Sequence, residues 1–83
     1  MVKNLYCIFD KNLERYNDPG YDVGDKEIMV NLKRAMYDKE SPLYKFAEDY
    51  DCYCLGSFDD KTGIIMLEKE PRLVCHLQSL KGE

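Results

Sequence analysis

The first apolar stretch of the chain predicts a strand, because residues 2–9 are rich in β-branched and aromatic side chains. Alternate positions fall on opposite faces of a strand, and both faces of this one are apolar. One face carries Leu5, Cys7 and Phe9, and the other carries Tyr6 and Ile8. We therefore expect a central strand, or one that is covered on both sides.

A hairpin and a loop are predicted next. Residues 10–12 indicate a turn, and residues 13–16 predict a return strand. Pro19 and Gly20 suit a β-turn, since proline presets φ at the second position and glycine supplies positive φ at the third. We expect residues 17–25 to be a loop whose acidic side chains are solvated.

The hydrophobic period changes to that of a helix after Asp25, which is the expected N-cap of a main helix running to about Asp38. Its apolar stripe comprises Ile28, Met29, Leu32, Ala35 and Met36. The other side carries Lys26, Lys33, Arg34 and Tyr37, and the first three account for most of the positive charge in the only markedly basic segment. Ser41 and Pro42 predict the start of a short second helix, because serine is a good N-cap and proline suits the first turn.

The C-terminal half predicts a second hairpin. Residues 51–58 indicate a strand in which Gly56 marks a bulge or a close backbone approach, and residues 59–63 a hairpin loop. The return strand is expected at residues 64–67, followed by a break and then, from Arg72 to Leu77, a last short strand or helical turn. Residues 78–83 predict a polar, frayed tail.

These elements predict one α+β domain over residues 1–83. A small antiparallel sheet, made of the N-terminal strand or hairpin and the C-terminal hairpin, packs against one main amphipathic helix and a short second helix. Hydrophobic residues make up 45% of the 83 residues and charged residues 34%, which is typical of a globular chain.

Charge narrows the functions open to this domain. The formal net charge of -4 excludes a protein that tracks phosphate with a generally basic surface. Contact with a nucleic acid would then rely on a local basic patch or on stacking by aromatic side chains, which include seven tyrosines.

Length and hydropathy set further expectations. No stretch reaches the roughly 18 uncharged apolar residues of a membrane helix, and the chain begins without a signal peptide. We therefore expect a soluble intracellular protein with no membrane partner. A small core leaves a thin margin over the chain entropy, roughly 1.5 kcal/mol of which is lost per ordered residue. A homodimer would add stability economically.

Four cysteines, Cys7, Cys52, Cys54 and Cys75, with His76 beside the last, are the candidates for metal binding. A zinc site at Cys52, Cys54, Cys75 and His76 is one alternative, although structural zinc ligand pairs usually leave about two to four residues between them. We expect reduced core cysteines, no metal and no cofactor. No catalytic motif occurs, so we expect no catalytic residues and no enzyme.

Several short motifs occur in an order that one known family shares. Residues 50–64 read YDCYCLGSFDDKTGI, and residues 71–74 read PRLV. The opening LYCIFD run at residues 5–10, with Tyr16 and Pro19 after it, fits the same pattern. In these motifs the chain resembles the small nonstructural protein of gokushovirus-type microviruses, which are single-stranded DNA phages. The resemblance covers most of the chain.

This resemblance implies a nonstructural protein that binds DNA or assists genome synthesis in the cytoplasm of the host cell, with no catalytic residues to carry over. Two departures matter. The acidic net charge weakens bulk phosphate binding, and Cys52 stands where an aliphatic residue is expected, which a packing role explains.

The leading hypothesis is a phage accessory protein that binds single-stranded viral DNA during genome synthesis or packaging. Its expected contacts are Lys33, Arg34 and Tyr37 on the main helix, extended by Arg15, Tyr16, Tyr53 and Arg72. The alternative is a protein–protein interaction module, homodimeric in one form, whose acidic face binds a viral replication protein or a host factor.

Overall fold

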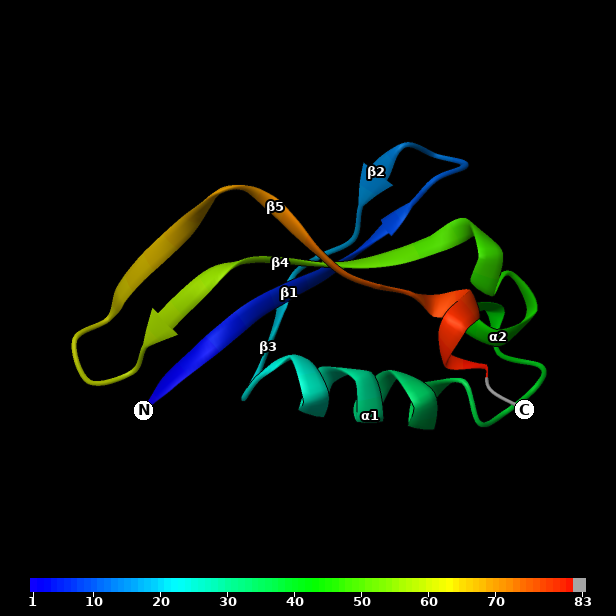
Figure 1. Cartoon of the computed structure of the whole chain (residues 1–83), viewed down its shortest axis with the longest axis horizontal. Helices are drawn as coiled ribbons and strands as arrows, with labels where there is room; N and C mark the ends of the chain where they lie inside the picture. Colours follow the sequence, from blue (N-terminus) through cyan, green and yellow to red (C-terminus); the bar gives the residue numbers. More distant parts are fainter. Residues whose placement is uncertain (82–83) are drawn as a thin grey trace.

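The structure is a computed structural model that describes residues 1–81. It contains an antiparallel sheet of five strands (Figure 1). The strands run in the order β2-β1-β4-β5, and β3 pairs with β1 on the same side as β2. Their bounds are Val2–Asp10 for β1, Arg15–Tyr16 for β2, Gly20–Asp22 for β3, Tyr50–Asp59 for β4 and Ile64–His76 for β5.

Helical segments cover one face of this sheet. The main helix α1 spans Asp25–Ala35 and the short helix α2 spans Pro42–Lys45, while two 3-10 segments, η1 and η2, span Ala47–Asp49 and Leu77–Leu80. Within the described residues, no helix is long and apolar enough to cross a membrane. An α+β fold with an antiparallel sheet, one main helix and a short second helix agrees with the expectation from the sequence.

The core lies between the sheet and the helical segments. β1 and β4 point Tyr6, Cys52 and Cys54 toward them, and these side chains are 3%, 0% and 1% exposed. The helical segments contribute the rest of the core cluster, namely Leu32, Met36, Ala47, Leu77 and Leu80. Because side chains alternate along a strand, the intervening residues of β1 and β4 lie on the second face of the sheet.

Three predicted boundaries were wrong. The loop expected at residues 17–25 contains β3, whose Tyr21 pairs with Leu5 of β1. The main helix ends at Ala35 and not near Asp38. Its N-cap is Gly24, with no side-chain cap, so Asp25 is the first helical residue and its carboxylate is available for other contacts. Ser41 caps α2 as predicted, since its Oγ accepts a hydrogen bond from the Leu43 amide at 3.2 Å.

The strand β5 is continuous where the sequence predicted a break at residues 68–71. The pairing explains the difference, because Leu67 lies opposite Gly56 and Arg72 opposite Cys54. Residues 68–71 therefore face the single residue Leu55, and the predicted break is a bulge within one strand.

The predicted frayed tail at residues 78–83 was wrong for residues 78–80. Leu77 and Leu80 sit three residues apart in η2, so they share one side of the 3-10 turn and enter the core. Leu77 is 0% exposed. Residues 82–83 lie outside the described residues.

Candidate nucleic-acid interface

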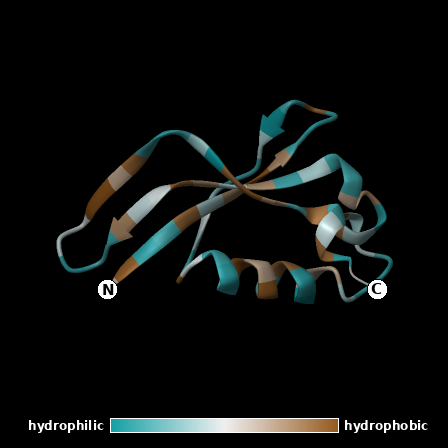
Figure 2. Ribbon diagram, viewed as in Figure 1, coloured by the Kyte–Doolittle hydropathy of each residue, from teal (hydrophilic) through white to brown (hydrophobic). Residues whose placement is uncertain are grey.

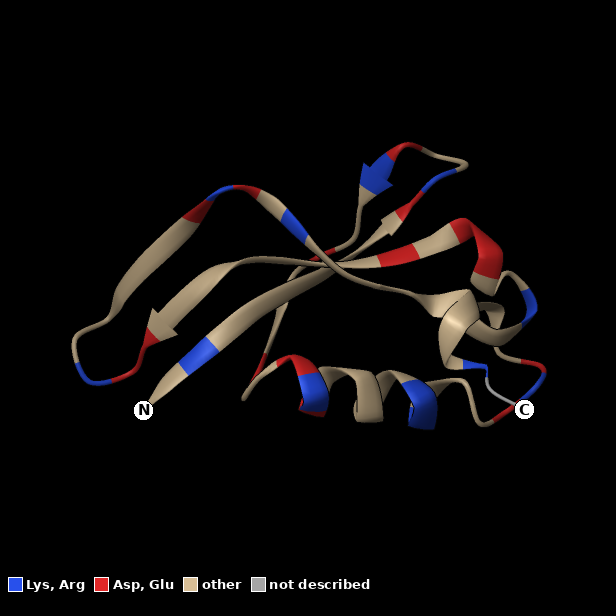
Figure 3. Cartoon of the chain, in the orientation of Figure 1, with Lys and Arg blue, Asp and Glu red and all other residues tan. Residues whose placement is uncertain are grey.

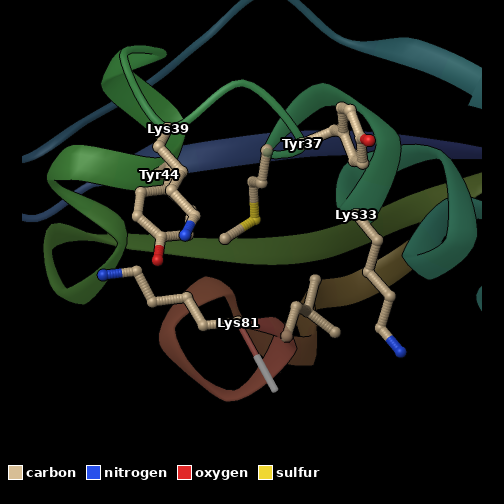
Figure 4. A pocket seen from close by; sticks show the side chains of 7 residues that line it. Lys33, Tyr37, Lys39, Tyr44 and Lys81 are labelled. Carbon is tan, nitrogen blue, oxygen red and sulfur yellow. The ribbon is translucent and has the colours of Figure 1, made fainter. Parts of the chain in front are cut away.

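A groove of about 540 Å³ lies where the end of α1, the loop after it, α2 and the residue after η2 meet (Figure 4). Its lining combines three lysines, two tyrosines and two core side chains: Lys33, Lys39, Lys81, Tyr37, Tyr44, Met36 and Leu80. We call these seven residues the basic groove. Met36 and Leu80 belong to the buried core, so they form a firm apolar base beneath the polar groups.

Four segments supply the polar groups of the basic groove, namely α1, the loop after it, α2 and the residue after η2. Lys33 lies in the last turn of α1, and Tyr37 follows the helix, where its amide donates a hydrogen bond to the Arg34 carbonyl at 3.1 Å. Lys81 follows η2, and its Nζ lies 4.4 Å from the centre of the Tyr44 ring. The tertiary contact between η2 and α1 therefore creates the cluster.

The basic groove is a local exception to the acidic character of the chain. Among residues 1–81, its lining contains three lysines and no acidic side chain. The adjoining loop contains Asp38 and Glu40, and Glu40 forms an ion pair with Lys45 at 3.1 Å. In Figure 3, basic segments at the end of α1 and beside the C-terminus lie at the same end of the molecule. A net charge of -4 can thus coexist with one positively charged groove.

The structure separates the three helix residues that the sequence grouped. Lys33 and Tyr37 line the basic groove, whereas Arg34 lines a different hollow with Lys26 and the acidic residues Asp22 and Glu27. Arg34 is displaced because successive helix residues point about 100° apart. Lys39, Tyr44 and Lys81 were not predicted from the sequence, since nothing local to each of these residues indicates that they meet.

Tyr16 and Tyr53 come together on the second face of the sheet, outside the basic groove. They form a cluster with Phe9, in which ring centres are 4.7 Å apart for Phe9–Tyr16 and 5.6 Å apart for Tyr16–Tyr53. The pairing of β1 with β2 and β4 produces this cluster, because Phe9 lies opposite Tyr16 and Cys7 lies opposite Tyr53.

Arg15 and Arg72 lie in other surroundings. Arg15 on β2 lies opposite Asp10 on β1, at the end of the β1–β2 ladder. The guanidinium of Arg72 donates two hydrogen bonds to Asp25, at 2.9 and 3.3 Å, and lies 3.6 Å from Glu68. Arg72 therefore lies beside two carboxylates, and its contact with DNA stays a prediction.

The Phage ORF5 protein family matches residues 3–80 of the chain. The chain belongs to the Phage ORF5 protein family. This membership confirms the expectation of a phage protein, and the narrower assignment to gokushovirus-type microviruses stays a prediction. No curated protein and no solved structure matches the chain.

The cysteines of this Phage ORF5 protein are free thiols, and Cys7, Cys52 and Cys54 are buried. Cys52 lies opposite Cys75, and the hydrogen bond between the two thiols raises the pKa of Cys52 and lowers that of Cys75. The Nδ1 atom of His76 instead lies 2.7 Å from the buried carboxylate of Asp51. Within residues 1–81, no three His, Cys, Asp or Glu side chains are grouped to hold a metal ion.

Asp25 joins three elements of the Phage ORF5 fold. Its carboxylate accepts a hydrogen bond from the buried Tyr6 hydroxyl at 2.6 Å, in addition to the two from Arg72. The contact connects α1 to β1 and to β5. The Arg72 guanidinium, and then the Tyr6 hydroxyl, lower the pKa of Asp25.

We expect Asp25→Asn to lower the free energy of unfolding at neutral pH by about 1 to 2 kcal/mol. Hydrogen bonds to a charged group contribute about 1.5 to 3 kcal/mol, and solvent screening reduces this value because the Asp25 side chain is 39% exposed. Because the folded-state pKa of Asp25 is lowered, its contribution is full above the ordinary aspartate pKa of about 4 and is lost as the pH falls through the folded value. Urea unfolding between pH 7 and pH 3 measures this change.

The difference in stability between the wild type and Asp25→Asn should therefore shrink in acid. Asp18→Asn is the matched control, since Asp18 lies exposed on the loop before β3 and the substitution makes the same change in charge. A difference between wild type and Asp25→Asn that stays constant across the pH range would contradict the role assigned to the carboxylate.

Proposed function

We propose that this Phage ORF5 protein is a non-catalytic accessory protein that binds single-stranded viral DNA during genome synthesis or packaging in the host cytoplasm. The observation that carries the proposal is the basic groove, where three lysines and two tyrosines meet over an apolar base. Membership of a phage protein family supports the viral part of this proposal.

The lysines suit the DNA backbone. Ammonium groups of Lys33, Lys39 and Lys81 placed around one groove neutralise neighbouring phosphates and release their counterions. Three such contacts on a single strand correspond to a slope of roughly -2 in a plot of log binding constant against log salt concentration. Binding that is spread over the surface would neutralise more phosphates and give a steeper slope, so the measured slope distinguishes the two.

The tyrosines suit unpaired bases. Tyr37 is 89% exposed, so its ring is available to stack on a base, whereas one face of the Tyr44 ring already contacts Lys81. Stacking requires a base whose face is accessible, which a single strand offers and a duplex does not. The proposal therefore specifies single-stranded DNA in preference to double-stranded DNA.

Charge reversal within the groove is the direct test. We expect Lys33→Glu/Lys81→Glu to weaken binding of a labelled single-stranded oligonucleotide at least about tenfold, because two attractive phosphate contacts become repulsive. Fluorescence anisotropy at several salt concentrations measures the affinity and the salt slope. Tyr37→Ala should weaken binding by less and leave the slope unchanged, since it removes stacking and no charge.

The matched control is Lys26→Glu/Arg34→Glu, which makes the same change in net charge on the other side of α1. We expect this variant to keep most of the affinity. Equal losses in both double variants would show that overall charge, and not the groove, determines binding. Absence of binding by the wild type at low salt would refute the proposal.

The alternative function, a protein–protein interaction module, draws support from the exposed aromatic cluster on the second face of the sheet. Tyr16 is 47% exposed and Leu73, opposite Tyr53 on β5, is 45% exposed. A viral replication protein or a host factor would use this face. Capture of a partner from infected cells that is lost in Tyr16→Ser/Tyr53→Ser, but kept in Lys33→Glu/Lys81→Glu, would favour this alternative.

A further inference from the structure

The far end of the β4–β5 hairpin is an apolar surface that no other segment of residues 1–81 covers. Ile64, Ile65, Met66 and Leu67 follow one another in β5 and are 56%, 49%, 66% and 75% exposed. We call these four residues the apolar arm. The hairpin extends beyond α1, away from the other helical segments (Figure 1), and Figure 2 shows brown segments along it. Four consecutive exposed apolar residues in a strand mark an interaction site.

Both faces of the apolar arm are apolar. Ile65 lies opposite Phe58 and shares the second face of the sheet, where the Phe58 ring is 5.4 Å from that of Tyr21. Ile64 and Met66 point to the other face, where they line a hollow with Val2. A partner that covered one face would leave the other in water, so the occupant has to cover both.

The free edge of the sheet indicates the backbone conformation of that occupant. β5 is the last strand in the order, so its outer amide and carbonyl groups pair with no strand of residues 1–81. Such an edge pairs with another extended segment. The occupant is therefore a strand that carries apolar side chains on both of its faces.

A second copy of this chain meets both requirements with the apolar arm itself. We propose that two copies pair antiparallel through β5, about a two-fold axis at Met66, and join their five-stranded sheets edge to edge. An axis perpendicular to the sheet keeps corresponding faces together. Ile65 of one copy then lies opposite Leu67 of the other, and each pair buries two exposed side chains.

Charge is compatible with this register. Each copy is acidic overall, so the paired stretch must not bring unpaired carboxylates together. With the axis at Met66, the one acidic residue among residues 64–68 is Glu68, and it lies opposite Ile64 of the other copy. Its carboxylate already lies 3.6 Å from the Arg72 guanidinium of its own copy.

The size of the apolar arm predicts a reversible dimer. A stable interface buries about 800 Å² and roughly 20 to 30 residues on each partner, more than one strand and its neighbours supply. The dissociation constant is therefore expected in the micromolar range, near -8 kcal/mol on the binding scale. The inference does not depend on DNA binding, because the basic groove and the apolar arm share no residue.

Light scattering coupled to size-exclusion chromatography tests the dimer over concentrations from about 5 to 500 μM, which span a micromolar dissociation constant. The mass of the wild type should rise from one chain toward two. Met66→Lys/Leu67→Lys should remain monomeric throughout, since lysines on an edge strand oppose pairing. Both sites are mostly exposed, so the variant should fold, which far-ultraviolet circular dichroism checks.

The control variant Leu13→Lys/Val30→Lys adds the same charge at exposed apolar sites elsewhere and should dimerise like the wild type. Amide exchange at residues 64–67 should slow as the dimer forms, because strand pairing protects these amides. A wild type that is monomeric at all concentrations would overturn the proposal. So would a dimer that Met66→Lys/Leu67→Lys keeps and Tyr16→Ser/Tyr53→Ser loses, which would place the contact on the sheet face.

Discussion

Gly56→Ala should lower the free energy of unfolding by about 3 kcal/mol, a large effect for the addition of one methyl group. Gly56 has a φ of 157°, which residues with a side chain rarely adopt. A Cβ at this position would overlap the Met66 carbonyl oxygen and lie 2.9 Å from the Leu67 Cα atom. Both neighbours are backbone atoms of β5, so no side-chain rotation relieves the overlap.

This glycine also sets the path of the hairpin. The pairing of β4 changes register beside Gly56 on both sides, with β1 between Leu5 and Tyr6 and with β5 between Cys54 and Gly56. The bend therefore depends on close approach of the strands, which confirms the bulge predicted from the sequence. In Gly56→Ala we expect the apolar arm to shift as well, so dimer formation should weaken in the fraction that stays folded.

Urea unfolding of Gly56→Ala and Gly20→Ala measures the effect with a matched control. An added Cβ at Gly20 meets no atom within 4 Å, so Gly20→Ala should change stability by less than about 1 kcal/mol. Similar unfolding midpoints for the two variants would contradict the close packing of β4 against β5 at Gly56.

Leu77→Ala should lower the free energy of unfolding by about 3 kcal/mol, within the usual range for a leucine replaced by alanine in a core. Leu77 is 0% exposed and is the largest of the fully buried side chains. A domain of this size is stable by only about 5 to 15 kcal/mol, so the variant should lose a substantial part of its stability.

Gln78→Ala provides the control for Leu77→Ala, because Gln78 is the next residue of η2 and is exposed. We expect a change of less than about 0.5 kcal/mol for this surface substitution. Thermal and urea unfolding distinguish the two outcomes. If the C-terminal segment were frayed, both substitutions would be nearly neutral, and the role of η2 in the core would be refuted.

Leu77→Ala also connects the core to the basic groove. η2 carries Leu80 into the base of the groove and positions Lys81 against Tyr44. Loosening η2 should therefore reduce DNA affinity even where the protein stays folded, while Gln78→Ala should leave affinity unchanged. The groove is thus coupled to packing at a residue that touches no DNA in the proposed complex.

Local sequence patterns determined the elements of this protein. The apolar run of β1, the helical stripe of α1, the Ser41 cap and the bend at Gly56 each depend on neighbours within a few residues, so they were predictable. The boundary errors at β3 and η2 share one cause. Both segments are short and polar in part, and their structure depends on pairing with β1 or packing against α1.

Tertiary structure alone decided where the candidate sites lie. The sequence identified Lys33 and Tyr37, but Lys39, Tyr44 and Lys81 join them only because η2 packs against α1. It also grouped Arg34 and Arg72 with the DNA contacts, whereas helix rotation separates Arg34 from the groove and Asp25 pairs with Arg72. A pattern of residues specifies which side chains share a face of their own element. Which faces meet, and which charges are neutralised, depends on contacts between residues far apart in the chain.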